Sequence, residues 1–269
     1  MAEVGVWSEL KYRLLHTYAE IFASSMKKKW GCRVYIDLFA GAGYAKIEKS
    51  DRIVRGSPML AIDIRDRFDR YVFCEQDNEK LEALRTRVSG QHPGVEARYV
   101  PGNVNHNVDR ILQEIPAARR SHTVLGFCFA DIFSMANLEF TTVERLSSRF
   151  VDFLVLIPTG MDAVRNFERY LSEDNETVDR FLGGTQWRAD WPSAKARGES
   201  IDVFLINMYG RAMEGLKYIY SGISDTKLIR SDERKLPLYR LAFFSRHPVG
   251  KDFWGEAKKY SDPQLGFPF

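Results

Sequence analysis

The stretch from Arg33 to Lys46, RVYIDLFAGAGYAK, decides the fold that the rest of the chain has to complete. Residues 33–39 are apolar enough for a buried strand, and they lead into a turn that contains Gly41 and Gly43. Glycines in such a turn let the backbone come close to a bound ligand. This order is typical of the first strand and nucleotide loop of a doubly wound α/β sheet, whose ligands lie outside the carboxyl ends of the strands.

The residues of the turn separate two cofactor classes. A dinucleotide fingerprint has its third glycine where this chain has Lys46. Asp37 lies four residues before Gly41, so we expect a carboxylate beside the ligand, where it repels a pyrophosphate and attracts an ammonium. S-adenosylmethionine (SAM) carries an ammonium and a sulfonium. The pattern D-x-F-x-G-x-G, from Asp37 through Phe39 to Gly43, resembles motif I of class I SAM-dependent methyltransferases. The plain alternative is a tight turn without a ligand.

Length and composition favour one domain that spans residues 1–269. A chain with 45% apolar and 13% aromatic residues can bury a full single core. No apolar run approaches the length of a bilayer span and the start of the chain lacks the order of a signal peptide, so we expect a cytoplasmic protein with no membrane association. The three cysteines are far apart and indicate core residues, with no metal site. A net charge of +3 does not by itself indicate nucleic-acid binding.

Helix-like and strand-like stretches alternate along the chain. We expect an N-terminal helix within residues 1–31, an inserted polar loop at 44–55 and a helix that begins at Ser57. The expected strands span residues 33–39, 70–75, 97–100, 123–131, 151–157, 215–223 and 236–247. The last two alternate like an antiparallel hairpin that closes the sheet. This order predicts an α/β fold with a doubly wound, mostly parallel, seven-stranded sheet of the class I methyltransferase type.

Polar residues near the glycine turn and at the strand ends are the candidate cofactor contacts. Ser57 is a good N-cap, and the free amides of a helix that starts near the glycine turn can bind a ligand carboxylate. Glu75 ends the second strand, where an acid in a nucleoside-binding sheet binds both ribose hydroxyls. The alternative is a solvated Glu75 beside a helix that Asp77 or Asn78 caps. Asn103 follows the third strand and is a candidate adenine contact, although an ordinary Asx turn explains it nearly as well.

The fourth strand is continuously apolar until Asp131, as expected for a central strand that is buried on both faces. Its end is expected directly above the cofactor, so Asp131 is a candidate for cofactor binding and for catalysis. Its carboxylate would accept hydrogen bonds from an acceptor amine, with the Ile132 carbonyl as a second acceptor. Phe133, the other catalytic candidate, would offer a face to a planar ring. The alternative is that Asp131 caps the next helix.

Two further residues beyond the fifth strand are substrate candidates. Residues 172–200 are polar and interrupted by glycines and a proline, which indicates an irregular lid or substrate-facing insertion with Trp187 as its anchor. Arg165 lies on the preceding expected helix. Its side chain either holds an anionic substrate group or pairs with Asp162 or Glu168.

Several short motifs, taken in order, resemble the three-Cys-motif partner proteins. These motifs are YIDLFAGAG, RGSP, IPTGM and FLGGTQWR, together with the two strand-ending acids Glu75 and Asp131. The resemblance covers nearly the whole chain. It implies a class I SAM-dependent methyltransferase from bacteria or mobile elements and a partner protein that carries the three-cysteine motif, but it implies no substrate. Members usually have Asp-Pro-aromatic-Gly after the fourth strand, whereas residues 131–134 are Asp-Ile-Phe-Ser, so the amino-methyltransferase arrangement stays in doubt.

The leading functional hypothesis is a SAM-dependent methyltransferase that acts on an unidentified acceptor, with nucleic acid or a modified base as one class and a small metabolite as another. The second hypothesis is a SAM-binding partner subunit in which residues 131–134 no longer catalyse. The third is a Rossmann oxidoreductase, which Asp37 and Lys46 disfavour.

Overall fold

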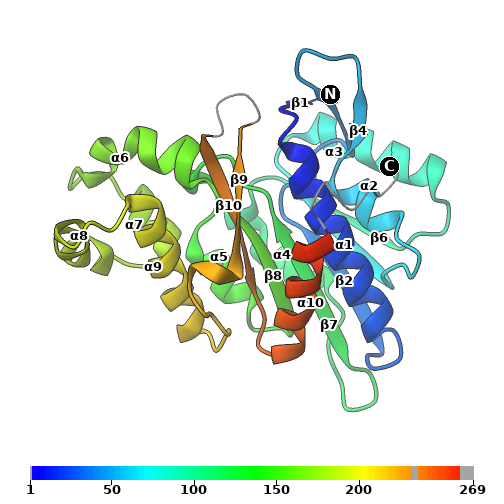
Figure 1. The fold of residues 1–269 in the computed structure, drawn as a ribbon. Coiled ribbons are helices and arrows are strands. Elements are labelled where there is room, and N and C mark those ends of the chain that lie inside the picture. Colours follow the sequence, from blue (N-terminus) through cyan, green and yellow to red (C-terminus); the bar gives the residue numbers. More distant parts are fainter. Residues whose placement is uncertain (1, 232–235, 261–269) are drawn as a thin grey trace.

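A sheet of seven strands forms the centre of the computed structural model, which describes residues 2–231 and 236–260 (Figure 1). The strand order is β6-β5-β2-β7-β8-β10-β9. The strands are β2 (Cys32–Asp37), β5 (Arg70–Glu75), β6 (Ala97–Pro101), β7 (Val124–Ala130), β8 (Val151–Ile157), β9 (Thr226–Arg230) and β10 (Pro237–Phe244). Neighbours from β6 to β8 run parallel, and β10 is antiparallel to both β8 and β9. The expected α/β fold with a mostly parallel seven-stranded sheet is therefore confirmed.

Helices cover the sheet from both sides. The α-helices of the described residues are α1 (Ser8–Met26), α2 (Ser57–Ile62), α3 (Asn78–Gln91), α4 (Val104–Glu114), α5 (Phe140–Leu146), α6 (Val164–Leu171), α7 (Thr177–Leu182), α8 (Gln186–Ala196), α9 (Ile201–Gly215) and α10 (Pro248–Tyr260). Successive strand residues point to opposite faces. In β10 the ring of Phe243 contacts Tyr18 of α1, and the ring of Phe244 contacts Tyr209 of α9. Helices α1 and α10 pack side by side on the first of these faces (Figure 1).

A second, small sheet replaces the polar loop that was expected at residues 44–55. Strands β3 (Tyr44–Ile47) and β4 (Ile53–Arg55) form an antiparallel hairpin, and β1 (Ala2–Val4) adds to it parallel to β3. The expectation of a loop is wrong because Ala45 and Ile47 alternate with polar neighbours and are buried, which is the period of a strand. The hairpin brings the first residues of the chain close to the glycine turn.

The strand expected at residues 215–223 is also misplaced. α9 continues to Gly215, and the edge strand β9 begins only at Thr226. The alternating aromatic residues Tyr218 and Tyr220 suggest a strand in the sequence, but both side chains dock elsewhere. The Tyr218 hydroxyl donates to the Val151 carbonyl at 2.9 Å, and the Tyr220 hydroxyl donates to Asn207 of α9 at 3.1 Å.

The segment 172–200 is helical and packed rather than irregular. Helices α7 and α8 lie within it, and Gly183, with φ +75°, ends α7 in the left-handed conformation that glycine favours. Trp187 is fully buried, and its indole N–H donates to Asp179 at 2.6 Å. The Trp191 ring lies 5.1 Å from the rings of Phe167 and Phe204. Glycines that suggested interruptions therefore mark helix ends.

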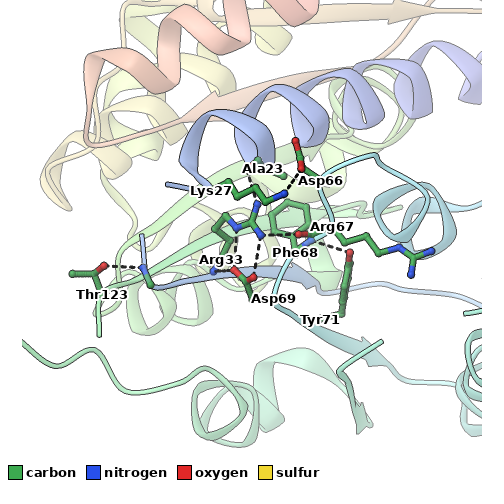
Figure 2. Close-up of polar contacts among 10 residues, drawn as sticks. Ala23, Lys27, Arg33, Asp66, Arg67, Phe68, Asp69, Tyr71 and Thr123 are labelled. Atoms are coloured by element: carbon green, nitrogen blue, oxygen red, sulfur yellow. Dashed lines mark hydrogen bonds and ion pairs between the residues drawn. The ribbon is translucent and has the colours of Figure 1, made fainter. Parts of the chain in front are cut away.

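A buried arginine ties α1 to the sheet (Figure 2). The Arg33 guanidinium donates to the Asp69 carboxylate at 2.9 and 3.0 Å, to the Ala23 carbonyl at 2.6 Å and to the Arg67 carbonyl at 2.8 Å. Ala23 belongs to α1, so these contacts join the helix to the start of β2 and to the loop before β5. They fix the helix on the sheet face that its apolar residues cover.

Within the described part of the chain, no helix is both long enough and apolar enough to cross a membrane.

Candidate functional site

A cavity of about 360 Å³ opens at the carboxyl ends of the parallel strands. This volume lies within the range of small-molecule sites. The cavity wall includes Phe39, Gly41, Gly43, Ser57, Glu75, Asn103, Asp131 and Phe133. Apart from Ser57, the first residue of α2, these candidates were chosen because they end or follow different strands, and the structure brings them together because the carboxyl ends of parallel strands share one edge of the sheet.

The two glycines of the turn have positive φ angles for different reasons. Gly41 has φ +61°, and a Cβ atom at this position would meet nothing within 4 Å, so its backbone faces open space. Gly43 has φ +85°, and a Cβ atom there would lie 2.9 Å from Leu84 Cδ1 and 3.2 Å from Met59 Cγ. Gly41 therefore leaves its backbone open to the cavity, whereas Gly43 lets the turn pack on the helices behind it.

Glu75 joins the glycine turn to the loop after β5. Its Oε2 accepts a hydrogen bond from the Gly41 amide at 2.7 Å, and its Oε1 accepts one from the Asp77 amide at 3.0 Å. Asp77 itself caps α3 by accepting from the amides of Glu79 and Lys80. Asp77 is therefore the helix cap, and each Glu75 oxygen keeps a further lone pair that can accept from a ligand hydroxyl at the cavity wall.

Asn103 lines the cavity and is also a helix cap. Its side-chain oxygen accepts from the Asn105 amide at 2.9 Å, so the expected Asx geometry is present at the start of α4. Because the cap uses the oxygen, the side-chain amide hydrogens are the groups that it can offer to a ligand base.

Asp37 lies beneath the glycine turn and does not line the cavity. It is 0% exposed, and it accepts hydrogen bonds from the Tyr35 hydroxyl at 3.0 Å and from the Phe39 amide at 3.3 Å. Burial raises its pKa to about 7, although hydrogen bonds from Ser57, Tyr35 and Phe39 oppose the shift. The side chain supports the turn from below, in place of the expected direct contact with a ligand ammonium.

Asp131 forms an ion pair with Lys11 of α1. The Lys11 ammonium donates to Asp131 Oδ2 at 2.6 Å, and the Lys11 side chain is only 7% exposed. The next helical turn, Met135–Asn137, is capped by Ser134, so the structure does not give Asp131 the capping role. Phe133 lies at the cavity with 80% of its surface exposed.

The prediction from strand ends did not include Lys11 or the part of the cavity around it. Tyr12 and Tyr239 also line the wall here, and their ring centroids lie 4.7 and 5.9 Å from the Lys11 ammonium. Burial alone would lower the pKa of Lys11, but the charge of Asp131, with smaller contributions from the two tyrosines, raises it well above its usual value. A signal existed in the sequence: Lys11 precedes Tyr18 by seven residues and so lies on the apolar face of the helix.

Arg165 and Trp187 lie outside the cavity wall. Arg165 is exposed on α6, and Trp187 belongs to the packed core of the α7–α8 segment. Asp162, one of the ion-pair partners considered for Arg165, accepts instead from the Met135 amide and the side chains of Asn166 and Tyr170. Neither substrate candidate therefore joins the residues at the strand ends.

Metal ligands do not cluster in the described residues: no group of three or more His, Cys, Asp and Glu side chains is placed to hold an ion. The three cysteines are buried and free.

Comparison with known proteins finds similar folds at low sequence identity. No protein-family model and no curated protein matches the chain. Among solved structures, a protein from Legionella pneumophila has 12% identity and a TM-score of 0.49, over 92% of this chain and 91% of that one. A geranyl diphosphate methyltransferase in complex with GPP and sinefungin has 12% identity and a TM-score of 0.42, over 85% of this chain and 77% of that one. Such values assign neither activity nor ligand to this chain.

Proposed function

We propose that the cavity binds SAM and that the protein is a SAM-dependent methyltransferase. The observation that carries this proposal is one cavity that gathers the glycine turn, Glu75, Asn103 and Asp131 from the ends of adjacent strands. The open space beside Gly41 fits a ligand that lies against bare backbone. In this proposal Glu75 holds the ribose hydroxyls, Asn103 meets the adenine, and the methionine part lies along the turn towards Asp131.

The division of roles follows the strand order. Glu75 ends β5 and Asn103 follows β6 on one side of the turn, and Asp131 follows β7 on the other. A nucleoside on the first side leaves its reactive end near Asp131 and Phe133. Bound SAM supplies an electrophilic methyl group, and the chain has mainly to position the acceptor in line with it. The antiparallel β10 between β8 and β9 agrees with the doubly wound sheet of the class I methyltransferase type.

We further infer membership of the three-Cys-motif partner family from the motifs in the sequence, and with it a protein partner that carries the cysteines. The exposed ring of Phe133 supports an acceptor with a planar ring, because base and aromatic faces stack without needing a particular base. A base in nucleic acid and a small aromatic metabolite both meet this description.

Labelling tests the reaction. The purified protein is incubated with SAM that carries a radioactive methyl group and, separately, with RNA, DNA, cell protein and a small-molecule extract. We expect label in one of these pools, and none with a Gly41→Val variant, whose side chain would enter the open space. A thermal-shift series with SAH, the demethylated product, and NAD runs in parallel. Stabilisation by NAD and not by SAH would contradict the assignment.

A further inference from the structure

The Lys11 ammonium has more hydrogen-bond donors than the described residues provide acceptors. In residues 2–231 and 236–260, its one hydrogen-bond acceptor is Asp131 Oδ2. An ammonium carries three donors, and a buried donor without an acceptor costs free energy. The Lys11 side chain lines the cavity, so a ligand in the cavity can accept from the ammonium hydrogens that Asp131 leaves unused.

Residues with hydroxyl groups surround Lys11 at this end of the cavity. Tyr12, Ser8 and Tyr239 all line the same wall. The Tyr239 hydroxyl is buried and has no hydrogen-bond partner among the described residues, and Ser8 lies beside it. An ammonium with unused donors at the wall of a cavity suits a ligand group that accepts hydrogen bonds and carries negative charge.

Lys11 lies at the end of the cavity where we expect the methyl acceptor. Its contacts are with Asp131 after β7 and with Tyr239 of β10. Glu75 and Asn103, the proposed nucleoside contacts, follow β5 and β6 at the opposite side of β2. Lys11 is therefore separated from the nucleoside end by the glycine turn.

We propose that Lys11 binds an oxyanion of the methyl acceptor, so that the acceptor is an oxygen acid such as a carboxylate or an acidic phenol. This inference rests on the proposed methyltransferase function. The ammonium hydrogens that Asp131 leaves unused need an acceptor, which an oxyanion provides, whereas a cationic amine has only donors and would meet the Lys11 charge at short range. An acceptor oxyanion forms the new O–CH₃ bond as the S–CH₃ bond breaks and its electron pair passes to sulfur, so no proton has to be removed.

Binding of simple probes tests the proposal without an identified substrate. Benzoate, benzyl alcohol and benzylamine are titrated by NMR into the protein saturated with SAH. We expect wild type to bind benzoate at least tenfold more tightly than the other two. Lys11→Met should remove this preference while the SAH affinity stays within about threefold. Lys27→Met is the matched control, because Lys27 lies just beyond the end of the same helix, is 56% exposed and pairs with Asp66 away from the cavity.

Each outcome has a separate meaning. A wild-type preference for benzylamine, or no benzoate binding, overturns the proposal. It is also overturned if Lys11→Met weakens SAH more than tenfold but leaves 5′-methylthioadenosine unchanged, because Lys11 would then hold the carboxylate of the cofactor. If wild type does not bind SAH, the proposed function fails, and the benzoate preference of the free protein still decides the role of Lys11. Should Lys11→Met not fold, the Lys11→Met/Asp131→Asn double variant removes both charges and takes its place.

Discussion

The two glycines of the turn should respond differently to the same substitution. Gly41→Ala adds a methyl group in open space, so its cost is the backbone strain at positive φ, on the order of 1 kcal/mol. Gly43→Ala adds the same strain and a contact of 2.9 Å with Leu84, and we expect a loss of roughly 2–4 kcal/mol. Urea unfolding measures both losses. Equal losses would contradict the different roles given to these glycines.

The Lys11–Asp131 pair should be costly to break from one side. Asp131→Asn leaves the buried Lys11 ammonium without its partner and should lower the free energy of unfolding by about 3 kcal/mol, whereas Lys11→Met leaves the Asp131 carboxylate, which is 20% exposed, and should cost less. The double variant should lose less than the sum of the two. The exposed pair of Lys27 and Asp66 is the control, and its loss should stay below about 1 kcal/mol. Additive losses at Lys11 and Asp131 in a chemical-denaturation cycle would show that the two charges do not depend on each other.

Residues at strand ends could be predicted from the sequence, and residues brought in by a distant helix could not. Glu75 and Asp131 were found because a parallel sheet gathers the carboxyl ends of its strands at one edge. Lys11 reaches the same cavity only because α1 lies across the sheet, where the contacts of buried Arg33 help to hold it. Asp37 was placed in the site by its position in a motif, but its side chain points to the same side as Tyr35, under the turn.

Among the elements, the α7–α8 segment should behave as a rigid part of the fold. Trp187 is fully buried and hydrogen-bonded to Asp179, so Trp187→Ala should cost about 3–5 kcal/mol. The SAH affinity should not change, because Trp187 is not in the cavity wall. Melting curves and SAH titrations measure both effects, with the exposed Phe133→Ala as the control for stability. Selective proteolysis between residues 172 and 200, slowed by SAH, would instead favour a mobile lid.

The long central strands were predictable, and the short edge elements were not. β5 and β8 begin and end where the sequence predicts, because each is built on an apolar run, residues 71–74 in β5 and 153–157 in β8, that marks a buried strand. β3, β4 and β9 are short and half exposed, so their patterns are weak, and pairing with other strands decides their places. The strand predicted at residues 215–223 was wrong because Tyr218 and Tyr220 have the two-residue spacing of a strand, although they pack on β8 and α9.

At the scale of the whole molecule, two buried carboxyls make stability depend on pH. Asp152 at the start of β8 lies beside the hydroxyls of Tyr18 and Ser245, and burial raises its pKa to about 7, as it does for Asp37. The folded state then holds protons that the unfolded state releases near pH 4, so stability falls as pH rises from about 4 to 7. Asp152→Asn removes one such group.

The comparison of wild type with Asp152→Asn isolates this effect. Between pH 5 and pH 8 the wild type should lose on the order of 2 kcal/mol of unfolding free energy relative to the variant. Urea unfolding at the two pH values measures the difference. A constant difference would mean that Asp152 does not titrate in this range, and a change of opposite sign would mean that the fold stabilises its charged form.

The whole account depends on one cavity that binds SAM through residues from neighbouring strand ends, and calorimetric titration of SAH tests this directly. We predict that wild type binds SAH and that Glu75→Gln weakens binding by about 10- to 100-fold, because a charged acceptor for the ribose hydroxyls is lost. Glu79→Gln, an exposed neighbour in α3, should bind like wild type. Binding of NAD without SAH, or an SAH affinity that Glu75→Gln leaves unchanged, would contradict the account.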